Sequence, residues 1–399
     1  MRCGVLYISY DGMLEPLGQS QVLGYVERLA ADLPVHLISF EKPEDWKRVA
    51  ERERVANRIS QSGIHWHPLS YHRRPTAPST AYDIAQGIRL GAWLVVRHRL
   101  SIVHARSYVP SVMALAIKRL TGARYLFDMR GFWADERVDA GMWPPEGRLY
   151  RLAKGFQRRF LQAADAVVSL THAAAHEISG FSYLAGRIPP ITVIPTCADL
   201  GRFTPRVGAA PERFTLGFVG SAGTWNQFGE VLSFFKAVRV LRPDARLLVV
   251  NRGEHDLIRK AVADASLHDN TVEITAADHF EVPSLIRQMT AGIAMRKPAY
   301  SNLGSAPTKI AEYLGCGIPC LGNGSVGDVA EILEGRRVGV AMTSYLNEDH
   351  ALAANRLLAL LEEPELGARC RQTAEAIFSL DKGVEAYRRI YASLQNLQP

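Results

Sequence analysis

The chain has 399 residues, which at roughly 150 residues per domain predicts two or three domains. Hydrophobic residues make up 47% of it and charged residues 22%, a balance that excludes a disordered chain, a coiled coil and a disulfide-stapled miniprotein. No apolar run approaches the ~20 residues of a bilayer span. The five spread-out cysteines are typical of reduced thiols in a cytosolic protein.

The net charge of +7 lies in the first half of the chain. Residues 1–203 hold 26 Lys and Arg against 18 Asp and Glu, whereas residues 204–399 hold 21 against 22. This asymmetry predicts an anionic partner for the first half. Nucleic acid, an anionic membrane surface and a phosphorylated substrate all have the required charge.

Short apolar strands alternate with helices along the first half. This pattern predicts a parallel sheet that is covered on both faces. The predicted strands are 5–9, 35–40, 102–105, 124–127, 166–170 and 191–194, and the predicted helices are 20–33, 45–60, 81–99 and 110–120.

A stretch with little periodicity, containing Pro195, Pro205, Gly208 and Pro211, is interpreted as an interdomain linker. The alternation then restarts, so we expect domains over 1–203 and 204–382, two doubly wound sheets whose ligands bind at the carboxyl ends of strands. The chain is helical from 349 onward, with a break near 380–383. The predicted strands of this half are 214–219, 246–250, 272–274, 292–295, 318–321 and 338–341.

The segment 305–319 carries the most informative motif. Ser305 is a good N-cap, and a helix N-terminus offers free N–H groups and a positive dipole end to a phosphate. Lys309 adds a positive charge, and Glu312, one turn further along, can accept hydrogen bonds from a ribose diol. The alternative, a surface helix with an i,i+3 ion pair, is favoured by composition alone.

This segment resembles the donor-binding helix of family 4 glycosyltransferases, whose pattern is E-x7-E followed by G-x-P. Glu312 and the tripeptide 317–319 match its second half. The loops at 10–21, 103–108 and 127–136 and the segment 194–203 resemble further parts of the same family, so the resemblance covers nearly the whole chain. Two departures stand out: Gly304 replaces the first Glu, and Gly220-Ser-Ala-Gly replaces the usual Lys-Gly.

The resemblance implies the GT-B fold, two Rossmann-like doubly wound parallel-sheet domains that face a cleft. It implies an acceptor on the first domain, a nucleotide-sugar on the second, and a final helix, about 383–397, that packs back on the first. The implied reaction is retaining transfer of a sugar from a nucleotide-sugar, a UDP-sugar in this family, to a hydroxyl acceptor in polysaccharide or glycolipid biosynthesis. We expect no cofactor and no metal, because the sequence has no D-x-D motif.

Site residues are assigned from the same resemblance and from their places at strand ends. The diphosphate is expected to meet Lys309, Lys297, Arg296 or Arg252, since the usual lysine is missing. The full assignment is: catalytic, Asp128, Arg130 and Lys309; donor-binding, Glu312, Thr308, Ser305, Lys297, Gly220, Ser221, Arg252, Gly18 and Gln19; acceptor side, His104, Arg106 and Glu136.

Several of these residues have a simpler interpretation. The charged run after strand 124–127 can be a solvated loop of paired charges, and His104 beside a strand is more often structural. Residues 322–327 match G-x-G-x-x-G, but they lie too late in the second half for a dinucleotide fingerprint. A glycine-permitted loop near the donor sugar, with Asp328 capping the next helix, fits better.

A basic helix supports the membrane interpretation. Its basic residues share one arc, and an amphipathic helix of this kind can rest on an anionic membrane or form a solvated face over a core. We therefore expect a cytoplasmic protein, peripheral at the inner face of the membrane, with a lipid-linked acceptor. The basic residues are Arg148, Arg151, Lys154, Arg158 and Arg159, and the apolar side is predicted to hold Leu149, Leu152, Phe156 and Phe160.

Two other functions are alternatives to glycosyl transfer. A sugar-nucleotide epimerase or hydrolase on the same fold would use the same site but needs an acid–base pair. A nucleic-acid-binding protein would explain the basic pI near 9.2, but the sequence lacks a recognisable module and the interleaved basic and aromatic residues that stack on bases.

Overall fold

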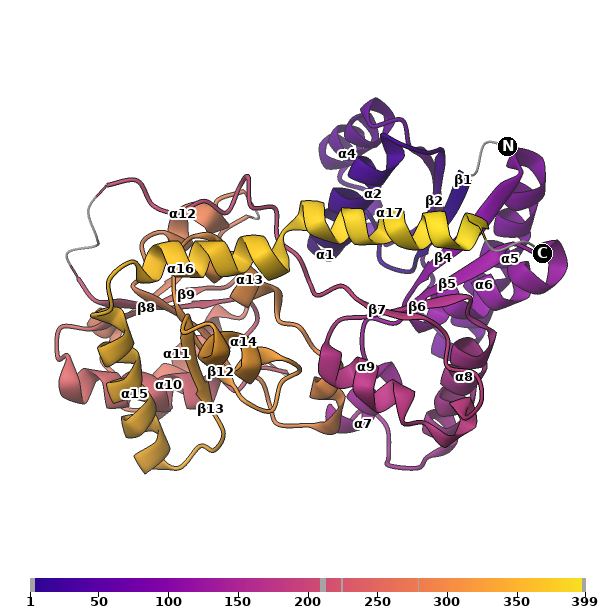
Figure 1. Ribbon diagram of the computed structural model, residues 1–399. Helices are drawn as coiled ribbons and strands as arrows, with labels where there is room; N and C mark the ends of the chain where they lie inside the picture. The colour runs from indigo at the N-terminus through magenta and orange to yellow at the C-terminus, as the bar shows by residue number, and fades with distance from the viewer. Residues whose placement is uncertain (1–3, 209–212, 224, 279, 397–399) are drawn as a thin grey trace. The chain divides into compact units, whose positions relative to one another are not determined.

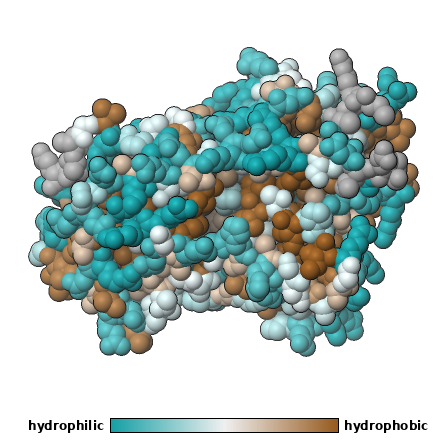
Figure 2. Space-filling model, in the orientation of Figure 1, coloured by the Kyte–Doolittle hydropathy of each residue, from teal (hydrophilic) through white to brown (hydrophobic). Residues whose placement is uncertain are grey.

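The computed structural model describes residues 4–208, 213–223, 225–278 and 280–396, and the chain divides into two compact units (Figure 1). The first unit comprises Met1–Pro195 and Leu380–Pro399, and the second comprises Thr196–Ser379. The boundaries expected from the sequence lie after residues 203 and 382, whereas the units divide after Pro195 and Ser379. Hydrophilic residues cover most of the visible surface (Figure 2), as a soluble arrangement of buried sheets requires.

A seven-stranded parallel sheet forms the centre of the first unit, in the order β3-β2-β1-β4-β5-β6-β7. Its central strands are buried along their length, which explains their continuous apolar runs. The strands are β1 (Gly4–Ser9), β2 (Val35–Glu41), β3 (His65–Ser70), β4 (Leu100–Arg106), β5 (Arg124–Asp128), β6 (Ala166–Ser169) and β7 (Ile191–Val193).

Helices cover both faces of this sheet. On one face α5 and α6 pack together and against β1 and β4, and on the other α2 packs against β2 while α17 packs against α2 and β4. The helices are α1 (Pro16–Gly18), a π-helical turn η1 (Gln19–Leu23), α2 (Gly24–Ala30), α3 (Pro43–Trp46), α4 (Val49–Gln61), α5 (Thr76–His98), α6 (Tyr108–Thr121), α7 (Trp133–Asp139), α8 (Arg148–Ala163), α9 (His172–Ser179), the 3-10 turn η2 (Ser182–Leu184) and α17 (Leu380–Asn396).

Three expectations for the first unit are corrected. The sequence analysis did not predict β3, an edge strand that is only half-buried and contains Pro68. Proline is confined to edge strands or bulges, so its presence weakens the strand signal. The helix expected at 45–60 is broken into α3 and α4, and the one expected at 20–33 begins as a π-helical turn and ends at Ala30.

The second unit contains a six-stranded parallel sheet in the order β10-β9-β8-β11-β12-β13. Its strands are β8 (Thr215–Val219), β9 (Arg246–Val250), β10 (Val272–Thr275), β11 (Ala291–Ala294), β12 (Cys320–Asn323) and β13 (Gly339–Met342). Its helices are α10 (Phe228–Leu241), α11 (His255–Asp264), η3 (Asp269–Thr271), α12 (Val282–Ile286), η4 (Tyr300–Gly304), α13 (Thr308–Gly315), α14 (Val329–Gly335), α15 (Asn347–Leu361), α16 (Leu366–Thr373) and the π-helical turn η5 (Ala374–Phe378).

A buried tyrosine fixes α13 against this sheet. The Tyr313 hydroxyl accepts a hydrogen bond from the Val219 backbone N–H at 3.0 Å, so the ring lies over the neighbouring strands β8 and β11. Gly292 makes room for it, because a Cβ there would lie 2.4 Å from the ring. This packing of Tyr313 against Gly292 places the N-terminal end of α13 beside the carboxyl ends of β8 and β11.

We expect Gly292→Ala to destabilise the second unit by about 1–3 kcal/mol, because overpacking a tight core costs this much. Gly229→Ala is the matched control. An added Cβ at Gly229 in α10 meets nothing within 4 Å, and alanine is the better helix former. Urea unfolding of both variants measures the difference. Equal stabilities would show that Tyr313 is not held as tightly as the contact distance indicates.

Candidate functional site

A cavity of about 290 Å³ opens at the carboxyl ends of β8 and β11. These two strands are neighbours at the point where the strand order of the second sheet reverses, and ligands of doubly wound sheets bind at this switch point. The lining residues include Gly220, Ser221, Asn226, Arg296, Thr308, Lys309 and Glu312.

The loop after β8 forms one wall, and Asn251 holds its shape. The Asn251 side chain donates to the Gly220 carbonyl at 3.0 Å and to Glu254 at 2.8 Å, and it accepts the Glu254 backbone N–H. Glu254 in turn accepts the Ala222 N–H at 2.7 Å. Gly220 has a φ of 115°, a conformation that glycine adopts without strain. The loop is therefore shaped before any ligand binds.

Helix α13 forms the opposite wall. It begins at Thr308 with Pro307 as the N-cap residue, so the expected capping by Ser305 is wrong. Proline's fixed φ suits a helix start, and the free N–H groups of the first turn remain available to a ligand. Ser305 itself is buried and is not among the lining residues.

Lys309 places a buried ammonium group against this cavity. Its Nζ atom is inaccessible to solvent, has no hydrogen-bond partner in the described part of the chain and lies 4.2 Å from the centre of the Phe218 ring. Burial, with the nearby charge of Arg296, lowers the pKa of Lys309 to about 7. A buried cation without an anion is costly, so the site favours an anionic ligand.

Glu312 and Arg296 complete the charged lining. Burial raises the pKa of Glu312 to about 7, although the charges of Lys309 and Arg202 act in the opposite direction. Arg296 follows β11, and its guanidinium lies 6.0 Å from the Trp225 ring. Because both pKa values are about 7, Lys309 and Glu312 can each gain or lose a proton near neutral pH when a charged group enters the cavity.

The glycine motif at 322–327 serves this site indirectly. Asn323, its second residue, accepts the Arg296 N–H at 2.7 Å and donates to the Arg296 carbonyl at 2.6 Å. The motif therefore fixes the backbone of a lining arginine. Sequence analysis missed Asn323 and Asn226, because a buried amide that holds a loop has no spacing rule.

Two predicted donor residues lie elsewhere. Lys297 and Arg252 are both exposed, and neither is among the lining residues of the cavity. The structure brings Lys309, Glu312, Thr308, Gly220 and Ser221 together around the cavity, whereas Lys297 and Arg252 lie outside its described lining.

In the first unit, the predicted catalytic and acceptor residues form a buried network with α17. His104 is 0% exposed and Asp128 1% exposed. The Tyr387 hydroxyl donates to Asp128 at 3.0 Å, and the Tyr391 hydroxyl lies 2.7 Å from His104 Nδ1. These contacts fix the C-terminal helix to the sheet and leave His104 and Asp128 no surface for a substrate.

Inside this network, acidic and basic side chains lie close together. Although burial alone would raise it, the charge of Arg130 and the contact with His104 keep the pKa of Asp128 below its usual value. Arg106 pairs with Asp11 across the switch point between β1 and β4. Glu136 lies half-buried in α7.

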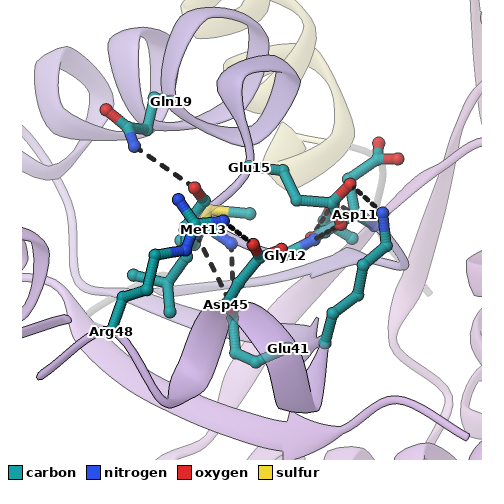
Figure 3. Close-up of polar contacts among 11 residues, drawn as sticks. Asp11, Gly12, Met13, Glu15, Gln19, Glu41, Asp45 and Arg48 are labelled. Atoms are coloured by element: carbon teal, nitrogen blue, oxygen red, sulfur yellow. Dashed lines mark hydrogen bonds and ion pairs between the residues drawn. The ribbon is translucent and has the colours of Figure 1, made fainter. Parts of the chain in front are cut away.

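The glycine loop after β1 is shaped by its own contacts (Figure 3). Buried Glu41 accepts the Met13 N–H at 2.8 Å, and the Gln19 side chain donates to the Leu14 carbonyl at 3.4 Å. A Cβ on Gly18 would lie 2.0 Å from the Gly12 carbonyl oxygen, so only glycine fits there. The structure thus gives Gly18 and Gln19 structural contacts within the loop.

The described residues contain neither a membrane-spanning helix nor a cluster of metal-ligating side chains. No helix there is long and apolar enough to cross a bilayer. No group of three or more His, Cys, Asp or Glu side chains in the same residues could hold a metal ion.

Comparison with known proteins identifies the first part of the chain. Residues 18–197 match the glycosyl transferase 4-like domain. The chain carries a glycosyltransferase domain. No curated protein sequence is similar enough to match the chain.

Solved structures extend this similarity in fold to both units. Sucrose-phosphate synthase of Thermosynechococcus elongatus and a glycosyltransferase of Rickettsia africae match with TM-scores of 0.72 and 0.71, each 14% identical over 100% of both chains. HepE of Anabaena, in complex with UDP and glucose, matches with a TM-score of 0.67 and 14% identity over 98% of this chain and 99% of its own. The predicted GT-B fold class, with two parallel-sheet α/β domains, is confirmed.

We expect Asn251→Asp to lower the free energy of unfolding by about 1–3 kcal/mol, because the Gly220 carbonyl loses its donor and a second carboxylate faces Glu254. Amide hydrogen exchange should also become faster at Ala222. Asn355→Asp, on the exposed face of α15, is the control and should leave both measurements unchanged. Unchanged exchange at Ala222 in the Asn251 variant would mean that Asn251 does not hold the loop.

Proposed function

We propose that the protein is a retaining glycosyltransferase that moves a sugar from a UDP-sugar to a hydroxyl acceptor. One observation carries the proposal: the buried Lys309 Nζ makes no hydrogen bond within the described chain, and it lies beside a cavity formed by the start of α13 and the loop after β8. A diphosphate supplies anionic acceptors for this group. The UDP and glucose bound to HepE support UDP as the nucleotide.

In this mechanism the diphosphate lies against the N–H groups at the start of α13, near Lys309 and Arg296. Cations and helix N–H groups aimed at the leaving diphosphate stabilise the charge that develops as the glycosidic bond breaks. Glu312 accepts hydrogen bonds from the ribose hydroxyls. A diphosphate oxygen takes the acceptor's proton on the face that the leaving group occupies, so the new bond keeps the anomeric configuration. The proposal needs no protein nucleophile and no metal.

Proton linkage tests the donor site. Since the pKa of Lys309 is about 7 in the free protein, binding a diphosphate should raise it and take up a proton. The affinity for UDP should then fall by up to about tenfold per unit as pH rises above 7, the limit for one linked proton. Lys309→Arg keeps its charge at every pH and should lose this dependence. Isothermal titration between pH 6.5 and 9 measures both proteins.

Glu312 is present in both proteins, so the difference between their pH profiles isolates Lys309. Identical profiles would remove Lys309 from the diphosphate site. Product analysis with UDP-sugars separates the related reactions. UDP release that requires an acceptor indicates transfer, release without an acceptor indicates hydrolysis, and conversion to another UDP-sugar indicates an epimerase.

We also propose that the first unit rests on the anionic inner face of a membrane, where a lipid-linked acceptor is found. Helix α8 buries Ala153, Gln157, Phe160 and Leu161, so Phe160 is buried as predicted but Leu149 and Leu152 of the predicted apolar side are not. Leu149 and Leu152 remain 55% and 56% exposed beside the arginines of the helix. Basic residues near an anionic surface contribute ~1 kcal/mol each, and exposed leucines add apolar contact.

Leu149→Ser with Leu152→Ser should weaken binding to anionic vesicles by about tenfold or more, since burying one leucine contributes ~1.5–3 kcal/mol. The control, Val96→Ser with Leu120→Ser, changes two residues of α5 and α6 that are each 69% exposed. Co-sedimentation with neutral and anionic vesicles at low and high salt measures binding. The membrane proposal fails if both double variants bind equally well, or if wild-type protein ignores lipid charge.

A further inference from the structure

A second cavity, of about 360 Å³, lies at the opposite edge of the second sheet. Arg246 begins β9 and is in register with Thr215, which begins β8. Parallel strands share an edge at their amino ends, so these residues lie away from the donor cavity. We call this the arginine cavity, after its lining residues Arg206, Arg213, Arg246 and Arg287.

The positive charge of the arginine cavity is unbalanced. Among the described lining residues Glu273 is the one acidic side chain, and no carboxylate of the described chain forms an ion pair with any of the four arginines. The second unit as a whole has 19 Lys and Arg against 21 Asp and Glu. Four guanidinium groups therefore gather around one cavity in a unit whose net charge is −2.

Some of these groups are positioned before a ligand arrives. Arg206 donates from Nη1 to the Arg287 carbonyl at 2.9 Å, which ties the segment before β8 to the end of α12. Burial lowers the pKa of Arg206, and no carboxylate acts against this. Leu247 and Leu248, both buried, also line the cavity.

We propose that the arginine cavity binds a small molecule through one or two phosphate groups. Guanidinium groups present forked donors that match phosphate oxygens, and they remain charged at every physiological pH. The cavity volume lies at the lower end of the range for small-molecule sites, about 300–1,000 Å³. A net lining charge of +3 suits a dianion or trianion. The phosphate belongs to a soluble ester or diphosphate, or to a phospholipid headgroup.

This site is distinct from the donor cavity. The two share no described lining residue. Thr215 lines one cavity and Val219 the other, at opposite ends of β8, roughly 13 Å apart at ~3.3 Å per residue. Wild-type protein should therefore bind two molecules of inorganic pyrophosphate at low salt. One site should require Lys309 and the other the arginines.

Isothermal titration with pyrophosphate tests the proposal. Arg213→Gln with Arg246→Gln should reduce the stoichiometry from two to one, or weaken one site at least tenfold. Lys309→Met should remove the other site. The control, Arg259→Gln with Lys260→Gln on α11, removes the same charge from exposed positions outside the cavity and should change affinity less than twofold. Thermal unfolding without ligand should show that all variants are folded.

A parallel measurement identifies the source of the phosphate. Wild-type and arginine-variant proteins are sedimented with phosphatidylcholine vesicles that contain or lack phosphatidic acid. Loss of a pyrophosphate site in the arginine variant supports a soluble ligand. Loss of binding to phosphatidic acid, with pyrophosphate binding unchanged, supports a headgroup. If neither binding changes, or if the charge-matched control loses as much, the proposal is overturned.

Discussion

A buried ammonium group that makes no hydrogen bond within the described chain is the constraint on which the candidate site of the second unit depends. Lys309 is kept from solvent by Phe218 and by the loop that Asn251 shapes, and Tyr313 fixes the helix that carries it. Desolvating a charge in this way costs free energy that the fold does not recover by itself. In the proposed function a bound diphosphate supplies negative charge beside Lys309, so part of this desolvation cost is offset when the donor binds.

The first unit shows the opposite arrangement. Asp128 is buried more completely, but it has Tyr387, His104 and Arg130 around it. Opposite charges lie within this network and stabilise the fold, although Asp128 Oδ1 and His104 Nε2 make no hydrogen bond within the described chain. Tyr387 comes from α17, the last helix of the chain, so the network helps to hold that helix on the first unit. Asp128 has charged and hydrogen-bonding neighbours within the fold, whereas Lys309 Nζ has no hydrogen-bond partner in the described chain. This difference distinguishes the structural cluster of the first unit from the candidate site of the second.

Sequence patterns predicted most of the fold, because buried parallel strands favour apolar runs, as in β1 and β9. They failed at the half-buried edge strand β3, where Pro68 and three polar residues hide the pattern. For the site, the capping and charge pattern around Lys309 and Glu312 identified the helix. Asn251 and Asn323 could not be found in this way, since their roles depend on loops that meet only after folding. The exposed leucines of α8 were also misplaced, because a helical wheel gives the direction of each residue but not which direction faces the core.

In the second unit, the positions of the charged side chains matter more for a cavity's charge than the net charge of the unit does. That unit is slightly acidic, yet it has unbalanced cations at both edges of one sheet. At the carboxyl edge, one buried lysine acts with a helix N-terminus. At the amino edge, where strands offer no comparable helix dipole, four arginines take its place. In the two proposals, the edge without a favourable backbone field needs more side-chain charge to hold a phosphate. The proposed sites therefore differ in their cations because the two edges of a parallel sheet present different backbone groups.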